Sequence, residues 1–130
     1  MIYQYQKHFT LEEARAYIPL LKYQISEIIK IKHHLDKIWF DIHTRKFHLG
    51  FNPDTLNEFP PEYEQFSDLV QALVDEGIFV KGFEEGLVDF PAVRNNGEEV
   101  FLCWKEGESD ISYWHTLSSG YRGRRPISEF

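Results

Sequence analysis

The feature that most constrains this chain is a long amphipathic run over residues 10–46. Apolar residues recur along it in alternating steps of three and four, and Lys32 takes the one slot that is not apolar. The apolar positions are Leu11, Ala14, Ile18, Leu21, Ile25, Ile28, Leu35, Trp39 and Ile42. This spacing keeps side chains on one stripe of an α-helix and is typical of a coiled-coil seam. At about 1.5 Å per residue the run predicts a helix of about 55 Å, longer than a globule of this size is wide.

Local signals mark the ends of this predicted helix. Thr10 and Glu13 form a Thr-x-x-Glu capping box at its start. Pro19 lies about two turns in, where proline removes a backbone hydrogen bond, so we expect a kink or a short helix ending before it. Gly50 and Pro53 supply the stop and turn signals, and they predict an end between residues 47 and 53.

A second helix is predicted over Pro61–Glu76, with Gly77 as its terminator. It should pack antiparallel against the first helix, but at about 24 Å it covers less than half of the rod. The stripe over residues 11–28 therefore needs another cover, either the C-terminal part of the chain or the same helix of another chain. Because monomers rarely leave such an apolar patch in water, we favour a homodimer or a higher homo-oligomer.

From residue 78 the pattern changes to short β-prone segments divided by turn residues. The predicted strands are Ile78–Phe83, Leu87–Val93, Val100–Trp104 and Ile111–Thr116, with a hairpin turn over residues 94–97. The sequence thus predicts an α+β fold in a single domain over residues 1–130. It comprises a helical hairpin over residues 1–77, an antiparallel meander of three or four strands over 78–117, and an irregular Gly- and Arg-rich tail over 118–130.

Composition limits the classes of function. The net charge of −7 divides into +3 over residues 1–50 and −10 over residues 51–130, a balance that argues against a nucleic-acid-binding face. No run approaches the roughly 20 apolar residues of a membrane span, and the N-terminus lacks the apolar core of a signal peptide. A single cysteine excludes an internal disulfide and fits a reducing compartment, so we expect a cytoplasmic protein.

Chemistry could reside on Asp89, Glu108 and His115, with Arg124 nearby in sequence. Two carboxylates and an imidazole could bind a divalent metal such as Zn, Mn or Fe, or act as an acid–base pair. Their spacing is not diagnostic, since no His-Glu-x-x-His or paired Cys-x-x-Cys motif occurs. The structural alternative is that Asp89 caps a turn, Glu108 pairs with Arg124, and His115 ends a strand.

Two further features have competing interpretations. Arg122, Arg124 and Arg125 stand among glycines, a composition that could bind a small anion, or could instead neutralise the acidic C-terminal part of the chain. Cys103 lies inside an alternating strand beside a tryptophan, and we interpret it as an inert buried residue rather than a nucleophile.

Four ordered blocks stand out in the C-terminal third: Gly86–Ala92 (GLVDFPA), Leu102–Glu108 (LCWKEGE), Tyr113–His115 (YWH) and Gly120–Pro126 (GYRGRRP). Together they resemble the prokaryotic domain-of-unknown-function family 2203, and Phe9–Ala14 with Pro19–Leu21 is similar to that family's first helix. One departure is Gly82, where the resemblance leads us to expect an acidic residue after Lys81. The resemblance implies a shared fold and a prokaryotic setting, but no activity.

Two functions remain open at this point. The first is a non-catalytic interaction or assembly module that self-associates through the long helix. The alternative is a metal-dependent, hydrolase-like enzyme that uses Asp89, Glu108 and His115 on an anionic substrate.

Overall fold

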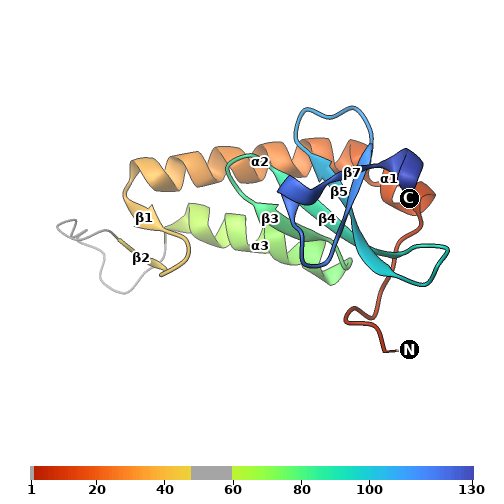
Figure 1. Cartoon of the computed structure of the whole chain (residues 1–130). Helices are drawn as coiled ribbons and strands as arrows, with labels where there is room; N and C mark the ends of the chain where they lie inside the picture. The colour runs from red at the N-terminus through yellow and green to blue at the C-terminus, as the bar shows by residue number, and fades with distance from the viewer. Residues whose placement is uncertain (1, 48–59) are drawn as a thin grey trace.

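The computed structural model describes residues 2–47 and 60–130, which form an α+β fold (Figure 1). Its helices are α1 (Leu11–Ala16), α2 (Ile18–Lys37) and α3 (Pro61–Asp75), with one-turn 3-10 helices η1 (Tyr121–Gly123) and η2 (Ile127–Glu129). A two-stranded sheet pairs β1 (Phe40–Asp41) with β2 (Lys46–Phe47). The second sheet has the order β3 (Phe79–Gly82), β4 (Leu87–Val93), β5 (Glu99–Lys105), β6 (Tyr113–Thr116), β7 (Arg125–Pro126), and all of its pairs are antiparallel.

The predicted start of the first helix is confirmed. The backbone N–H of Glu13 donates to Thr10 Oγ1 at 3.1 Å, and the Glu13 carboxylate accepts from the Thr10 N–H at 3.0 Å, which completes the capping box. The interruption expected near Pro19 is also present, because α1 ends before Tyr17 and α2 begins after it. Pro19 lies in the first turn of α2, where its missing N–H has no intrahelical partner to lose.

The predicted extent of the long helix is wrong, because α2 ends at Lys37 rather than near residue 46. Trp39 has φ +63° and Arg45 has φ +57°, left-handed backbone conformations that an α-helix does not contain. Between them the chain turns back and forms the β1–β2 hairpin. The twenty residues of α2 give a helix of about 30 Å. Trp39 is not part of the buried apolar stripe, since 56% of its surface is exposed.

A side-chain turn helps to divert the chain at this point. Asp41 Oδ1 accepts the backbone N–H groups of His43 at 2.8 Å and Thr44 at 3.3 Å, an Asx-type arrangement that competes with helix continuation. The stop signals proposed at Gly50 and Pro53 lie outside the described residues.

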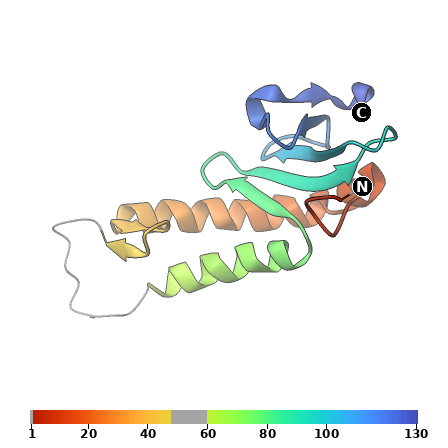
Figure 2. The ribbon, with the colours of Figure 1, turned by 60° about the horizontal axis from the view of Figure 1, so that its bottom comes forward.

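The second helix is confirmed to within one residue of its predicted end. Helix α3 spans Pro61–Asp75, and Gly77 follows with φ +87°, the left-handed conformation that glycine adopts freely at a helix terminus. The two views in Figures 1 and 2 show α2 and α3 side by side and antiparallel. The five-stranded sheet lies over one half of this pair, and the β1–β2 hairpin lies at the other end (Figure 2).

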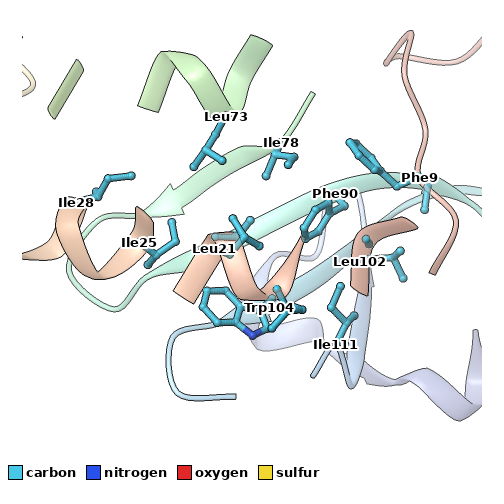
Figure 3. Close-up of a cluster of buried hydrophobic side chains, with 14 of the residues drawn as sticks. Phe9, Leu21, Ile25, Ile28, Leu73, Ile78, Phe90, Leu102, Trp104 and Ile111 are labelled. Carbon is cyan, nitrogen blue, oxygen red and sulfur yellow. The ribbon is translucent and has the colours of Figure 1, made fainter. Parts of the chain in front are cut away.

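The apolar stripe of the first helices is buried by the chain itself. Ala14, Leu21, Ile25, Ile28 and Leu35 each have 0% of their surface exposed. Figure 3 shows the stripe residues Leu21, Ile25 and Ile28 gathered with side chains of α3 and the large sheet. Of the two covers considered from sequence, the sheet of the same chain is the one observed, so this stripe no longer argues for a second chain.

The meander has more strands than predicted. The turn over residues 94–97 is confirmed, with Gly97 at φ +89°. The interpretation of residues 118–130 as irregular is wrong, because β7 pairs with β6 as a fifth strand through Tyr113↔Pro126 and Trp114↔Arg125. A strand of two residues is too short to show alternation, and proline is tolerated there because β7 is an edge strand.

Alternation along the central strands gives the large sheet two unlike faces. The inner face packs on the helices and is apolar, with Val88, Phe90, Ala92, Val100, Leu102 and Trp104 all at 0% exposure. The outer face carries the odd-numbered residues of β4, β5 and β6. Among the described helices, none is long and apolar enough to cross a bilayer.

Candidate metal centre

Three buried residues with metal-binding side chains meet at the middle of the outer face. Asp89 of β4 is the direct cross-strand partner of Cys103 of β5, and His115 of β6 pairs with Phe101, two residues away from Cys103. Directly opposite and diagonal positions on one face place side chains within reach of each other. Asp89, Cys103 and His115 are 4%, 1% and 3% exposed, so the cluster is shielded from bulk water.

The cluster is compact enough to surround one ion. One ligand atom from each residue can be chosen such that all lie within 4.8 Å of one another. His115 Nε2 lies 3.0 Å from Asp89 Oδ1, and His115 Nδ1 lies 2.8 Å from the backbone carbonyl of Thr116. Because a carbonyl can only accept, Nδ1 carries a proton, and Nε2 is the nitrogen directed at the cluster. Such a backbone contact is the usual way of orienting a histidine that binds metal.

The protonation states follow from burial and charge. Burial alone would lower the pKa of His115, but its hydrogen bond to Asp89 and the carboxylate charge outweigh burial and raise the pKa. Burial, reinforced by the Asp89 charge, raises the pKa of the Cys103 thiol to about 12. Without a metal, His115 therefore holds a proton more strongly than a free imidazole does, and the Cys103 thiol beside it stays neutral.

Glu108 lies outside this cluster but contacts it through Arg124. The Arg124 guanidinium donates to the Glu108 carboxylate at 2.6 and 3.3 Å, so the pairing considered from sequence is present. Arg124 Nη1 also lies 3.9 Å from Cys103 Sγ. The guanidinium stacks on the rings of Tyr113 and Tyr121, at 3.9 and 4.7 Å from their centroids. Glu108 therefore holds an arginine against the cysteine rather than supplying a third ligand.

The three arginines predicted to bind an anion have different surroundings. Arg124 lies at the outer face beside Cys103, whereas the Arg125 guanidinium lies 5.4 Å from the ring of Trp114, which belongs to the core. Arg122 is exposed in η1.

A cavity of about 150 Å³ opens beside the cluster. Its walls are Lys81, Leu87, Phe101, Leu117, Gly120 and Tyr121, together with Asp89, Cys103 and His115. The ammonium of Lys81 lies 5.0 Å from the ring centroid of Phe101. The cluster therefore has a small space next to it that could admit a ligand.

The N-terminal segment is tied down over the same side of the sheet. Glu99 accepts the backbone N–H groups of Gln4 at 2.8 Å and Tyr5 at 3.0 Å, and it contacts His8 Nε2 at 2.6 Å. Burial would raise the pKa of Glu99, but these hydrogen bonds outweigh it and lower the pKa. The Tyr5 ring packs on Phe101, 5.3 Å between centroids, and so covers part of the outer face.

Sequence analysis missed Cys103 as a site residue. The antiparallel register pairs odd residues with odd residues across β4, β5 and β6, which brings Asp89, Cys103 and His115 to one face. The sequence predicted the strands and the turn over residues 94–97, but not this register.

Nothing in the structure explains the departure at Gly82. A Cβ atom at this position would meet the carboxylate of Glu85, which is the far end of a flexible side chain.

Comparison with known sequences assigns the chain to a family. The profile of the family described as "Uncharacterized conserved protein (DUF2203)" matches residues 7–127, so this chain belongs to that family. No curated protein and no solved structure gives a significant match.

Proposed function

We propose that this protein binds a divalent transition metal through Asp89, Cys103 and His115, and that the metal acts on a small anionic substrate in the adjacent cavity. The observation that carries the proposal is the compact set of three buried ligand atoms, all within 4.8 Å of one another, at the wall of that cavity. A buried charged pair without such a role gives weak stabilisation, because desolvation offsets the attraction between its charges.

The donor set favours Zn²⁺. One thiolate, one imidazole nitrogen and one carboxylate oxygen are ligands that zinc accepts in tetrahedral geometry. Magnesium and calcium prefer all-oxygen sites, and structural zinc sites use four protein ligands. Three protein ligands leave the fourth position for water or substrate, as in catalytic zinc sites, where the metal lowers the pKa of bound water and polarises carbonyl or phosphoryl groups.

A cysteine-nucleophile mechanism has less support from the same residues. In a Cys–His–Asp triad the histidine bridges the thiol and the carboxylate with its two ring nitrogens. Here Nδ1 of His115 is bound to the backbone and Nε2 faces Asp89, so neither nitrogen is bonded to Cys103. A thiol pKa of about 12 also keeps the sulfur protonated in the absence of a metal.

Arg124 has a supporting role in the proposed site. Its guanidinium, 3.9 Å from Cys103 Sγ, would stabilise the thiolate that forms when the metal displaces the thiol proton. Glu108 balances the charge of Arg124 and fixes its position.

Self-association through the long helix is the weaker candidate. The stripe that suggested it is buried within one chain, at α3 and the large sheet. It remains a prediction, and light scattering at micromolar concentration tests it.

Elemental analysis tests the proposed metal site. Untagged protein purified without chelator should carry close to one transition metal per chain, and the Asp89→Ala/His115→Ala double variant should carry almost none. His8→Ala is the matched control, because His8 pairs with Glu99 on the same side of the sheet, outside the cluster. Equal metal content in wild type and double variant, or none in a wild type also challenged with zinc, would contradict the proposal.

A further inference from the structure

If a metal binds as proposed above, the charged groups around the cavity leave one positive charge without a negative partner. This inference therefore rests on the proposed function. A divalent ion is balanced by the Asp89 carboxylate and a Cys103 thiolate, while Arg124 is balanced by Glu108. Lys81 is the remaining charged residue of the cavity wall. Within residues 2–47 and 60–130 its ammonium forms no ion pair and instead lies over the rings of Phe79 and Phe101, at 5.6 and 5.0 Å.

The size of the cavity limits the ligand. A space of about 150 Å³ is comparable to cavities that hold a benzene-sized molecule, with about six non-hydrogen atoms. A whole nucleotide or peptide is too large to fit inside it. A small molecule is therefore the class of ligand that fits.

The chemistry of the walls limits the ligand further. Leu87, Phe101 and Leu117 supply apolar surface, and charged groups are confined to Lys81 and the metal ligands. Phosphate is recognised by several N–H donors or by arginine forks, and Arg124, which contacts the cluster at Cys103, already pairs with Glu108. A ligand with one carboxylate and a short apolar chain matches these walls. Its carboxylate suits the Lys81 ammonium and the open metal position, and its chain suits the apolar surface.

We infer that the cavity binds a short-chain monocarboxylate, with its carboxylate between the metal and Lys81 and its chain against Leu87, Phe101 and Leu117. Lys81 acts as the specificity-determining residue for the negative charge. It comes from β3, whereas the three metal ligands come from β4, β5 and β6, so the substrate-recognising charge can be removed without touching the cluster.

The test uses cobalt-loaded protein, because the visible absorption of Co²⁺ reports a change in its ligands. Butyrate has six non-hydrogen atoms and one negative charge, and butyramide is its neutral counterpart of the same size. We expect butyrate to change the cobalt spectrum saturably and butyramide to bind at least about tenfold more weakly, as expected for the loss of a charge-assisted contact. Lys81→Met should weaken butyrate binding by a similar factor.

Lys22→Met is the matched control, since it removes the same charge from an exposed position of α2, and it should leave butyrate binding unchanged. Cobalt content is measured on each sample. Full cobalt uptake with no response to butyrate, or with equal responses to butyrate and butyramide, overturns this inference alone. Equal butyrate affinity in wild type and Lys81→Met also overturns it, whereas failure of the wild type to take up cobalt overturns it together with the proposed function.

Discussion

The two faces of the five-stranded sheet are equally buried at their centres but chemically unlike. Leu102 and Cys103 are neighbours in β5, at 0% and 1% exposure, yet Leu102 packs among apolar side chains and Cys103 lies beside Asp89 and His115. Burying apolar surface stabilises the fold directly. Burying a carboxylate and an imidazole does so only if their pairing offsets the loss of hydration. Burial alone therefore does not separate core from site, whereas the polarity of the buried groups does.

The largest effect on stability should come from the inner face. Leu102→Ala removes a fully buried side chain from the sheet–helix interface and should lower the free energy of unfolding by about 3 kcal/mol, measured by urea denaturation. Leu20→Ala, at a position 47% exposed on α2, should cost less than about 0.5 kcal/mol. Equal losses in the two variants would contradict the assignment of the inner face as the core.

On the outer face, the contact of Arg124 with Cys103 should increase the affinity of the protein for Zn²⁺. Arg124→Met removes the guanidinium from Cys103 Sγ and should weaken Zn²⁺ binding about 10–100-fold, the range for residues that contact metal ligands. Arg125→Met is the adjacent control, because Arg125 stacks on Trp114 at the core side. Competition with a chromogenic chelator measures the Zn²⁺ affinity of both variants. A comparable loss of affinity in Arg125→Met would show that the effect of Arg124→Met does not come from its contact with Cys103.

The metal-free outer face should make stability depend on pH. The folded-state pKa of His115 is raised above the unfolded value of about 6.5. The stabilisation from its pair with Asp89 is thus complete below about pH 6.5 and is lost as the pH rises through the folded-state pKa. In chelator, the difference in unfolding free energy between wild type and His115→Gln should shrink from pH 6 to pH 9. A constant or growing difference would show that the imidazole is not charged in the fold.

The smallest effect on stability should come from the residue next to Leu102. Cys103→Ala removes one sulfur atom beside an existing cavity, so its cost in unfolding free energy in chelator should stay within about 1 kcal/mol. The same change should abolish tight metal binding. A cost as large as that of Leu102→Ala would mean that Cys103 belongs to the core, as first interpreted from the sequence.

The inner face and the helices were predictable because local signals specify them. Each of three helix ends is specified by residues close to it in sequence. These signals are the Thr10–Glu13 capping box, the proline at the start of α3 (Pro61) and the glycine after α3. Hydrophobic alternation from residue 87 onward likewise identified the central strands. In these segments propensity, pattern and tertiary packing favour the same structure.

The end of α2 and the site were less predictable, because both depend on contacts between distant residues. The helical spacing of apolar residues continues through Trp39 and Ile42. Ile42 is indeed buried, but it lies in the β1–β2 hairpin and not in a helix. The cluster depends on the register between three strands, which brings Asp89 and His115 to Cys103. Judged alone, a cysteine beside a tryptophan in an alternating strand has the pattern of a core residue, and only the assembled face shows its polar neighbours.

The most direct test of the metal centre is a titration of the metal-free protein with Co²⁺, followed by absorption spectroscopy. If Asp89, Cys103 and His115 bind the ion, one equivalent should produce intense visible bands of tetrahedral cobalt and a thiolate-to-cobalt charge-transfer band in the near ultraviolet. Cys103→Ser should lose the charge-transfer band while remaining folded. A wild-type protein that shows neither feature, or a Cys103→Ser variant that keeps the charge-transfer band, would contradict the account.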